Sequence, residues 1–178
     1  CAYIWMQPPA VYPEAYYIEG APAVTFEARR FLPQSKSLNT LASFMAQRAA
    51  REAGVHEGLL HHAGCLTEGS NSNLFAVIDG VLVTPPAEEV LSGVTRDVVL
   101  RLAAANGIPL RTGPLPLDRM ADWQECFITS TSRHVMPLTL IDGRPVGGGK
   151  PGPVTVRVRE LFEKYYEQRT YIGSTSET

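Results

Sequence analysis

The spacing of apolar residues along the chain indicates three amphipathic helices. Apolar side chains recur at helical intervals in residues 39–54, 95–107 and 153–169. Gly54 and the Asn106–Gly107 pair are typical of helix ends, and Ser37 or Asn39 is expected to cap the first helix. The faces predicted to be buried are Leu41, Phe44, Met45, Ala49 and Ala53 in the first helix, and Val154, Val158, Leu161, Phe162 and Tyr165 in the last.

Short apolar runs bounded by Gly, Pro and polar residues predict strands between these helices. The strand-like segments are 2–9, 23–33, 58–62, 72–86, 108–112, 125–130 and 135–143, with a short helix over 116–123. Within 72–86, the Asp79–Gly80 pair separates two β-rich runs and predicts a two-residue hairpin turn. Strands and helices mix without strict alternation, so the predicted fold class is a mixed α+β domain.

Composition and charge narrow the possible functions. A chain of 178 residues, 44% hydrophobic and 19% charged, is typical of one globular domain with a proper core. A net charge of −2 gives no electrostatic footprint for nucleic acid or an anionic membrane, and no apolar run approaches the ~18 residues that span a bilayer. Residues 1–13 lack the features of a signal peptide. Cys1, Cys65 and Cys126 form no CxxC pair, which favours a reducing, cytoplasmic location.

Several familiar catalytic patterns are incomplete in this chain. The four histidines have no spacing typical of a metal site, and no metal is predicted. Residues 143–152, GRPVGGGKPG, depart from a phosphate-binding Walker loop at Arg144 and Pro151, so a flexible turn is expected there. The serine-rich EGSNSN segment lacks the second glycine of a G-x-S-x-G elbow, which makes a hydrolase nucleophile a poor interpretation.

Three other segments carry residues suited to one kind of cofactor. Lys36, between a predicted strand and a helix, is either a solvated surface lysine or a partly buried Schiff-base lysine. In LSGVTRD, Val94 and Thr95 begin a predicted helix, which is either an ordinary helix start or an anion site that hydroxyls of ITSTSR can extend. Glu68 is an isolated carboxylate in a polar turn. Together these match the aldehyde, phosphate and pyridine nitrogen of pyridoxal 5′-phosphate (PLP).

The order of these motifs resembles the class IV aminotransferases. KSLN, LTEGSNSNLF, DGVLVTPP, LSGVTRD, FITSTS, MPLTLIDG and GPVT follow one another within residues 1–167. This fold-type IV PLP family includes D-amino acid and branched-chain aminotransferases and aminodeoxychorismate lyase. The resemblance implies the family's large C-terminal domain, a mixed sheet or pseudo-barrel with flanking helices, with the small N-terminal domain mostly absent. The expected division is a remnant of the small domain and linker over 1–18, the PLP-binding domain over 19–170 and a frayed tail over 171–178.

The resemblance also implies roles for individual residues. Lys36 is expected to form the Schiff base with PLP and to shuttle a proton, and Glu68 is expected to bind the pyridine nitrogen. Val94 and Thr95 match backbone donors to the phosphate. The other expected cofactor neighbours are Leu91 on the ring face, Thr131 on the phosphate, the polar residues Ser70, Asn71 and Ser132, and Arg29 on the strand leading to Lys36, whereas Asn73 is expected to be structural.

Departures from the family pattern leave the substrate and its chirality open. Arg133 and His134 stand where the family usually has a glutamate after small residues. The intact EGS element favours transamination between an amino acid and a 2-oxo acid over a lyase reaction that releases pyruvate. A vestigial cofactor domain is the third alternative. Family members build their sites across a dimer interface, so the resemblance implies a homodimer.

Overall fold

The described part of the chain forms ten strands that belong to one mixed sheet. The computed structural model describes residues 3–6, 8 and 10–170, so the tail predicted over 171–178 lies outside it. The strands are β1 (Ala21–Glu27), β2 (Glu57–His62), β3 (Cys65–Gly69), β4 (Ser72–Ile78), β5 (Val81–Thr84), β6 (Leu110–Thr112), β7 (Leu115–Pro116), β8 (Glu125–Ser130), β9 (His134–Ile141) and β10 (Arg144–Pro145).

Most of this sheet closes on itself. The strand order is β6-β5-β4-β8-β9-β1-β2-β3-β7, and an additional pairing joins β3 to β4. The strands β4, β8, β9, β1, β2 and β3 therefore make a closed ring, in which β1 runs parallel to both of its neighbours and the other pairs are antiparallel. The predicted α+β pseudo-barrel with flanking helices is confirmed.

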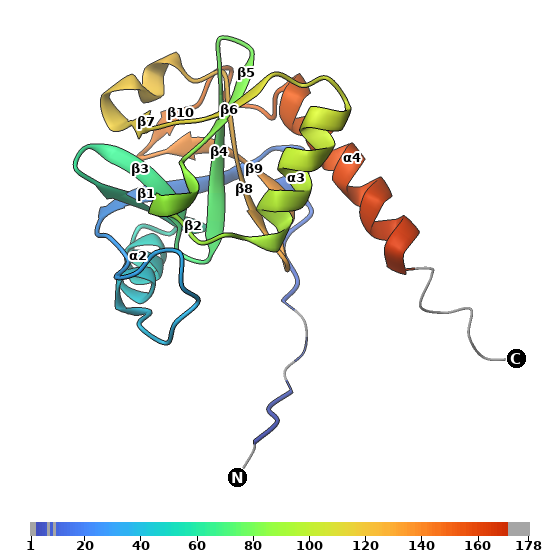
Figure 1. Cartoon of the computed structure of the whole chain (residues 1–178). Helices are drawn as coiled ribbons and strands as arrows, with labels where there is room; N and C mark the ends of the chain where they lie inside the picture. Colours follow the sequence, from blue (N-terminus) through green and yellow to red (C-terminus); the bar gives the residue numbers. More distant parts are fainter. Residues whose placement is uncertain (1–2, 7, 9, 171–178) are drawn as a thin grey trace, which may run out of the picture.

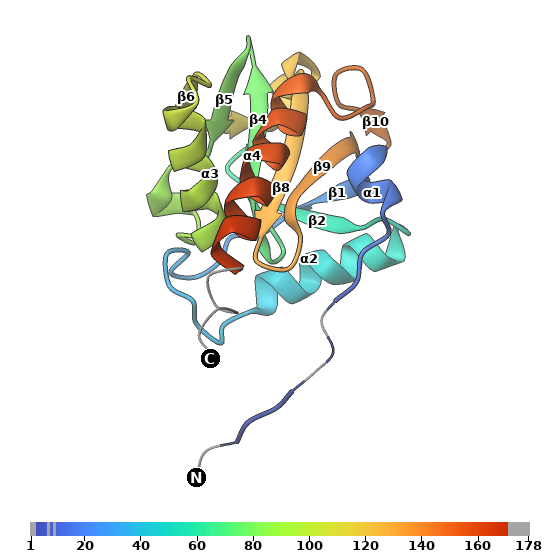
Figure 2. The same cartoon turned by 90° about the vertical axis from the view of Figure 1, so that its right-hand side faces the viewer.

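Helices cover two sides of the ring. The helices are α1 (Ala15–Ile18), α2 (Leu41–Glu52), α3 (Val94–Ala105) and α4 (Pro153–Thr170), with 3-10 turns η1 (Ala87–Glu89) and η2 (Leu117–Asp122). Helices α3 and α4 lie side by side and pack on β8 and β9, whereas α2 packs on β1 and β2 (Figures 1 and 2).

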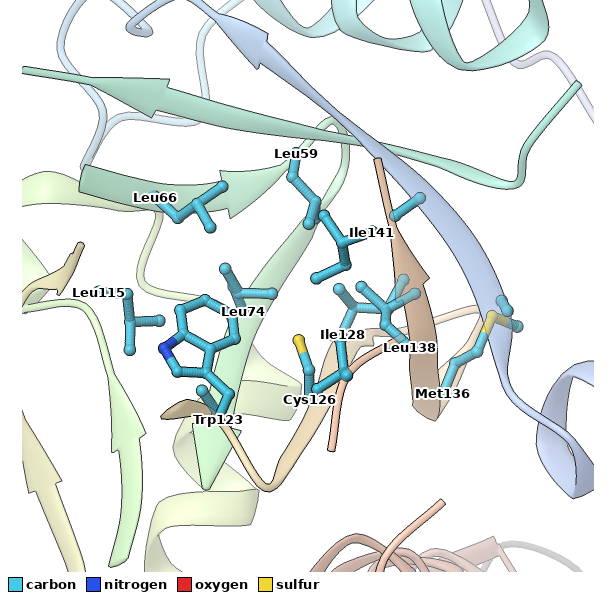
Figure 3. Packing of buried hydrophobic residues seen from close by; sticks show 14 of the residues in the cluster. Leu59, Leu66, Leu74, Leu115, Trp123, Cys126, Ile128, Met136, Leu138 and Ile141 are labelled. Atoms are coloured by element: carbon cyan, nitrogen blue, oxygen red, sulfur yellow. The ribbon is translucent and has the colours of Figure 1, made fainter. Parts of the chain in front are cut away.

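Alternation along β4 and β8 divides the apolar residues between two cores. Leu74 and Ile128 point into the ring, where they pack with Trp123 (Figure 3). Phe75 and Phe127 are paired in register, point outward, and stack with ring centroids 4.8 Å apart beneath α3 and α4. The predicted inner face of the last helix is confirmed, because all five of its residues belong to or pack against this outer core.

The predicted inner face of α2 is wrong. Leu41 and Phe44 are exposed, and the buried residues are Ser43, Ala46 and Ala50. The cause is a very close approach of the helix to β2, since a Cβ added at Gly58 would overlap the carbonyl oxygen of Ala46. At such a short distance only small side chains fit between a helix and a sheet.

Among the other local predictions, those of turns are confirmed, and those of a helix cap and of the first strand are wrong. Asp79 and Gly80 both have positive φ, as the predicted hairpin turn requires, and Gly54 and Gly107 adopt positive φ after α2 and α3. Neither Ser37 nor Asn39 caps α2: the N-cap is Thr40, which makes no side-chain capping bond within the described chain. Residues 3–6, within the segment predicted as a strand over 2–9, form no strand and are exposed.

Candidate cofactor site

A cavity of about 580 Å³, lined by many polar residues, opens where the ends of β3, β4 and β8 meet the start of α3. Its volume lies within the range of small-molecule sites. The loop between β1 and α2 supplies the remaining wall, with Lys36 and Ser37 on it. Predicted site residues from four separate segments line this one cavity: Lys36, Glu68, Ser70, Asn71, Leu91, Val94, Thr95, Thr131 and Ser132.

Glu68 is the buried carboxylate of the cavity. It lies near the end of β3, pairs with Asn73 of β4, and exposes only 4% of its side chain. One carboxylate oxygen lies 3.1 Å from Arg30 Nη1, and the other accepts the backbone N–H of Leu91 at 3.0 Å. Burial raises the pKa of Glu68, whereas the Leu91 N–H and the charges of Arg30 and Lys36 act in the opposite direction.

The arginine that lines the cavity and reaches this carboxylate is Arg30, whereas Arg29 was the arginine expected beside the cofactor. Arg29 does not line the cavity, and its guanidinium forms an exposed ion pair with Glu89 at 3.1 Å. Arg30 exposes only 10% of its side chain and also donates to the carbonyl of Ser35. The predicted strand over 23–33 ends at Glu27, so the alternation of a strand does not decide which of the two arginines points inward.

Lys36 lies on the exposed edge of the cavity. Its flanking residues Ser35 and Ser37 are exposed too, so the position is that of the solvated alternative and not of the partly buried amine. The lysine charge acts on the pKa of Glu68, which places both groups in the same electrostatic field. The cavity therefore combines an accessible amine with a desolvated carboxylate.

The start of α3 contributes backbone donors. Gly93 is the N-cap in an extended conformation, and the first amides of the helix, at Val94 and Thr95, have no acceptor inside it. A Cβ at Gly93 would overlap Asn73 Oδ1, so glycine permits the close contact with β4. The amide of Asn73 donates to the Leu91 carbonyl at 2.8 Å, which fits the structural role expected for Asn73.

Hydroxyl groups from the end of β8 face the same space. Thr129 is buried and lines the cavity, yet its Oγ1 has no hydrogen-bond partner within the described residues. Thr131 and Ser132 line the cavity from the turn that follows β8 and are exposed. An unpaired buried hydroxyl beside free helix amides suits a ligand that brings oxygen atoms.

Glu57 is a functional candidate that sequence reasoning missed. It begins β2, its side chain is fully buried, and its Oε1 accepts hydrogen bonds from Ser70 N and Ser70 Oγ at 3.2 and 2.6 Å. Its Oε2 accepts Ser72 Oγ at 3.0 Å. A Cβ at Gly69 would overlap Ser72 Oγ, so this glycine permits the tight turn. The hydroxyl of Ser70, predicted to lie beside a cofactor, is thus already bonded to Glu57.

Comparisons with known proteins agree with this arrangement. The model of the amino-transferase class IV family matches residues 3–141. The D-alanine aminotransferase of Listeria monocytogenes is 37% identical over 151 residues, which cover 84% of this chain and 52% of that protein. The chain spans about half the length of the curated relatives it matches.

Solved structures give the same result. The branched-chain amino acid aminotransferase of Escherichia coli has a TM-score of 0.81 and 32% identity, over 89% of this chain and 55% of that one. The branched-chain amino acid aminotransferase of Thermobaculum terrenum, in its PLP form, has a TM-score of 0.81 and 26% identity, over 92% and 55% of the two chains. The chain belongs to the class IV aminotransferase family.

Class IV aminotransferases are PLP-dependent enzymes, and the residues of the cavity fit that cofactor. Its polar groups are of the right chemistry, since an amine, an accepting carboxylate, helix amides and an unpaired buried threonine hydroxyl all line one space. These chemical types are complementary to the aldehyde, the ring nitrogen and the phosphate of PLP.

Proposed function

We propose that this chain carries the cofactor-binding part of an aminotransferase that moves an amino group between an amino acid and a 2-oxo acid. The observation that supports this most strongly is the meeting of Lys36, Glu68 and the start of α3 around one cavity. Bound PLP supplies the aldehyde that captures the amino group and a ring that accepts electrons from the substrate. The other steps belong to residues of the chain.

Lys36 has the role of nucleophile and proton carrier in this proposal. Its accessible position at the cavity edge suits an amine that must bond to the cofactor and then yield to the substrate. Once released, the same amine would take the proton from the substrate α-carbon and donate it to the cofactor carbon that carried the aldehyde. Chirality of the substrate follows from which face Lys36 can reach.

Glu68 has the role of holding a positive ring nitrogen. One oxygen of its carboxylate already pairs with Arg30. The other oxygen accepts a hydrogen bond from the backbone N–H of Leu91. A cation at the ring would add to the groups that favour the ionised carboxylate against the effect of burial. Arg30 therefore joins the proposed cofactor residues, and Arg29 leaves them.

Phosphate binding is proposed for the start of α3 with the β8 end. The amides of Val94 and Thr95 and the positive end of the helix dipole favour an anion, and Thr129, Thr131 and Ser132 add hydroxyl donors. Leu91 is proposed to pack on the ring. Asn71, exposed on the β3–β4 turn, and Ser70 border the cofactor rather than bond its phosphate.

A homodimer is part of the proposal. Apolar side chains beside the cavity are exposed on the β1–α2 loop and the first turn of α2: Phe31, Leu32, Leu38, Leu41 and Phe44. A cluster of this kind is typical of an interaction surface, and the expected second copy would cover it. Size-exclusion chromatography with light scattering gives the mass in solution, and a monomeric mass at tens of micromolar would contradict the dimer.

A cytoplasmic location is also proposed. Cys65 and Cys126 are free thiols, which suits a reducing compartment. No helix in the described part of the chain is both long and apolar enough to cross a membrane.

The experiment that tests the function combines titration and turnover. Adding PLP to the purified chain is expected to give the absorbance of a lysine-linked cofactor, and Lys36→Ala is expected to abolish it. Amino transfer that requires a 2-oxo acid supports transamination, whereas pyruvate release without an acceptor identifies a lyase. Cofactor binding without either reaction means that this chain alone is only a binding domain. If the absorbance persists in Lys36→Ala, the lysine assignment is wrong.

A further inference from the structure

A second buried ion pair lies behind the cavity and has no part in the roles assigned so far. Arg133 Nη1 is 3.5 Å from Glu57 Oε2, and the two side chains expose 11% and 0% of their surface. Glu57 also holds the β3–β4 turn through Ser70 and Ser72. Arg133 belongs to the β8–β9 turn, which lies far along the chain from Glu57.

Arg133 and its neighbours make several contacts around the second turn. Its backbone N–H donates to Ser130 Oγ at 3.2 Å, and its carbonyl accepts the hydroxyl of Tyr17 at 3.2 Å. Its guanidinium lies 5.3 Å from the centre of the Tyr12 ring. The Tyr12 hydroxyl is in turn 3.2 Å from Ser132 Oγ. Arg133 is therefore held from three sides.

Both turns line the cofactor cavity. Residues 69–72 form one side, and residues 130–132 form another. Their strands are joined at the base by the pairing of Asn73 with Thr129. Beyond that pair, the contact between Glu57 and Arg133 connects the two turns, because Glu57 also bonds Ser70 and Ser72.

The pair is poorly arranged for stability alone. Arg133 Nε is buried and has no hydrogen-bond partner within the described residues. Buried ion pairs often contribute little net stability, because desolvation offsets the attraction between the charges. Their best-supported role is to select one geometry among several.

We propose that Arg133 is a positioning residue for the cofactor cavity, acting through Glu57 to hold the β3–β4 and β8–β9 turns at one fixed separation. This role of Arg133 rests on the proposed function only because PLP is taken as the ligand of the cavity. The groups positioned are the backbone around Ser70 and Asn71 on one turn, and the hydroxyls of Thr131 and Ser132 on the other.

The first test uses the chain without cofactor. Amide hydrogen exchange is measured for wild type, Arg133→Met, Arg133→Lys and the control Arg101→Met, which removes an exposed ion pair with Asp97. In Arg133→Met, exchange is expected to rise about tenfold in both turns together, through local opening. Arg133→Lys is expected to restore most of the protection. Unchanged exchange in the β3–β4 turn would overturn the proposal.

The second test separates positioning from stabilisation. The double variant Glu57→Gln/Arg133→Met leaves no buried charge unpaired, so it is expected to fold even if Arg133→Met does not. Its affinity for PLP, measured by absorbance titration, is expected to remain about tenfold weaker than that of wild type, at the low end of effects seen for supporting residues. If the double variant binds PLP as tightly as wild type, the pair has only a stabilising role and the proposal is wrong.

Failure of the proposed function gives a different pattern. A wild-type chain that shows no PLP absorbance at all contradicts the cofactor assignment, whereas hydrogen exchange still decides whether Arg133 couples the two turns.

Discussion

The two sides of the cavity differ in how their polar groups are held. On the sheet side, Glu57 and Glu68 are buried, and every carboxylate oxygen accepts a hydrogen bond. On the loop side, Lys36 and its flanking residues are exposed, and so are several large apolar side chains. The fold itself holds the two carboxylates of the sheet side in place. The loop side carries the amine of Lys36 on an exposed surface that another molecule can contact.

The largest expected difference between the two sides concerns their carboxylates. Glu57→Ala removes the partner of a buried arginine and two buried serines, so it should lower the free energy of unfolding by about 3–5 kcal/mol. Glu89→Ala on the exposed pair with Arg29 is the matched control and should cost about 0–1 kcal/mol. Urea unfolding followed by circular dichroism measures both. Equal losses would mean that the sheet side is no better organised than the loop side.

Glycine substitution sharpens the same comparison at the β3–β4 turn. Gly69→Ala forces Ser72 to move away from Glu57 and should cost about 1–3 kcal/mol, as overpacking does. At Gly148 an added Cβ meets no atom within 4 Å, so Gly148→Ala should leave stability unchanged or raise it by up to about 1 kcal/mol. Thermal unfolding of the two variants checks this, and a larger loss at Gly148 would refute the packing argument.

The pH dependence of stability tests the polar groups behind the sheet side. Burial, and then the charge of Arg133, lower the pKa of His56 below its ordinary value. A lowered pKa means that the folded state prefers neutral histidine, so stability is complete above the unfolded pKa of about 6.5 and declines as pH falls through it. His56→Leu should therefore lose less stability between pH values of about 7.5 and 5.5 than wild type. Melting temperatures of both proteins at the two pH values measure this loss. If wild type and His56→Leu lose the same stability, His56 does not cause the pH dependence.

The smallest expected effect on folding lies on the loop side. Leu38 is 99% exposed, so Leu38→Ser should change the free energy of unfolding by no more than about 0.5 kcal/mol. Its effect should be on association instead, with weaker self-association if the proposed homodimer covers this surface. Light scattering over a concentration series measures it. A stability loss of several kcal/mol would show that Leu38 is buried in solution.

Local sequence signals predicted the parts of the fold that local physics decides. The Asp79–Gly80 turn needs positive φ at both residues, and the apolar face of α4 follows from helical spacing. The inner face of α2 was predicted wrongly because Gly58, which lets the helix approach, lies on another element. Strand β3 was missed because TEG resembles a polar turn, although Glu68 pairs with Asn73 in the sheet.

The candidate site was predictable as far as its motifs were continuous in sequence. Lys36, Glu68 and the start of α3 each lie in a recognisable segment, and they line one cavity. Glu57 gave no such signal, because it stands in an ordinary strand and its partner Arg133 is remote in sequence. Arg30 was overlooked in favour of its neighbour, since β1 ends at Glu27 and the alternation of a strand does not decide which of the two arginines points inward.

The closed ring also limits the order in which its strands can pair while the chain is being synthesised. Strand β1 lies between β2 and β9, with Ala21 opposite Leu138 and Ala23 opposite Ile141. During synthesis β1 can pair with β2 as soon as that strand follows, but its other edge stays unpaired until residue 141 has been synthesised. Contacts so distant in sequence form slowly, and an unpaired edge invites pairing with another chain. We therefore expect synthesis that stalls before β9 to yield an aggregating intermediate rather than a smaller folded domain.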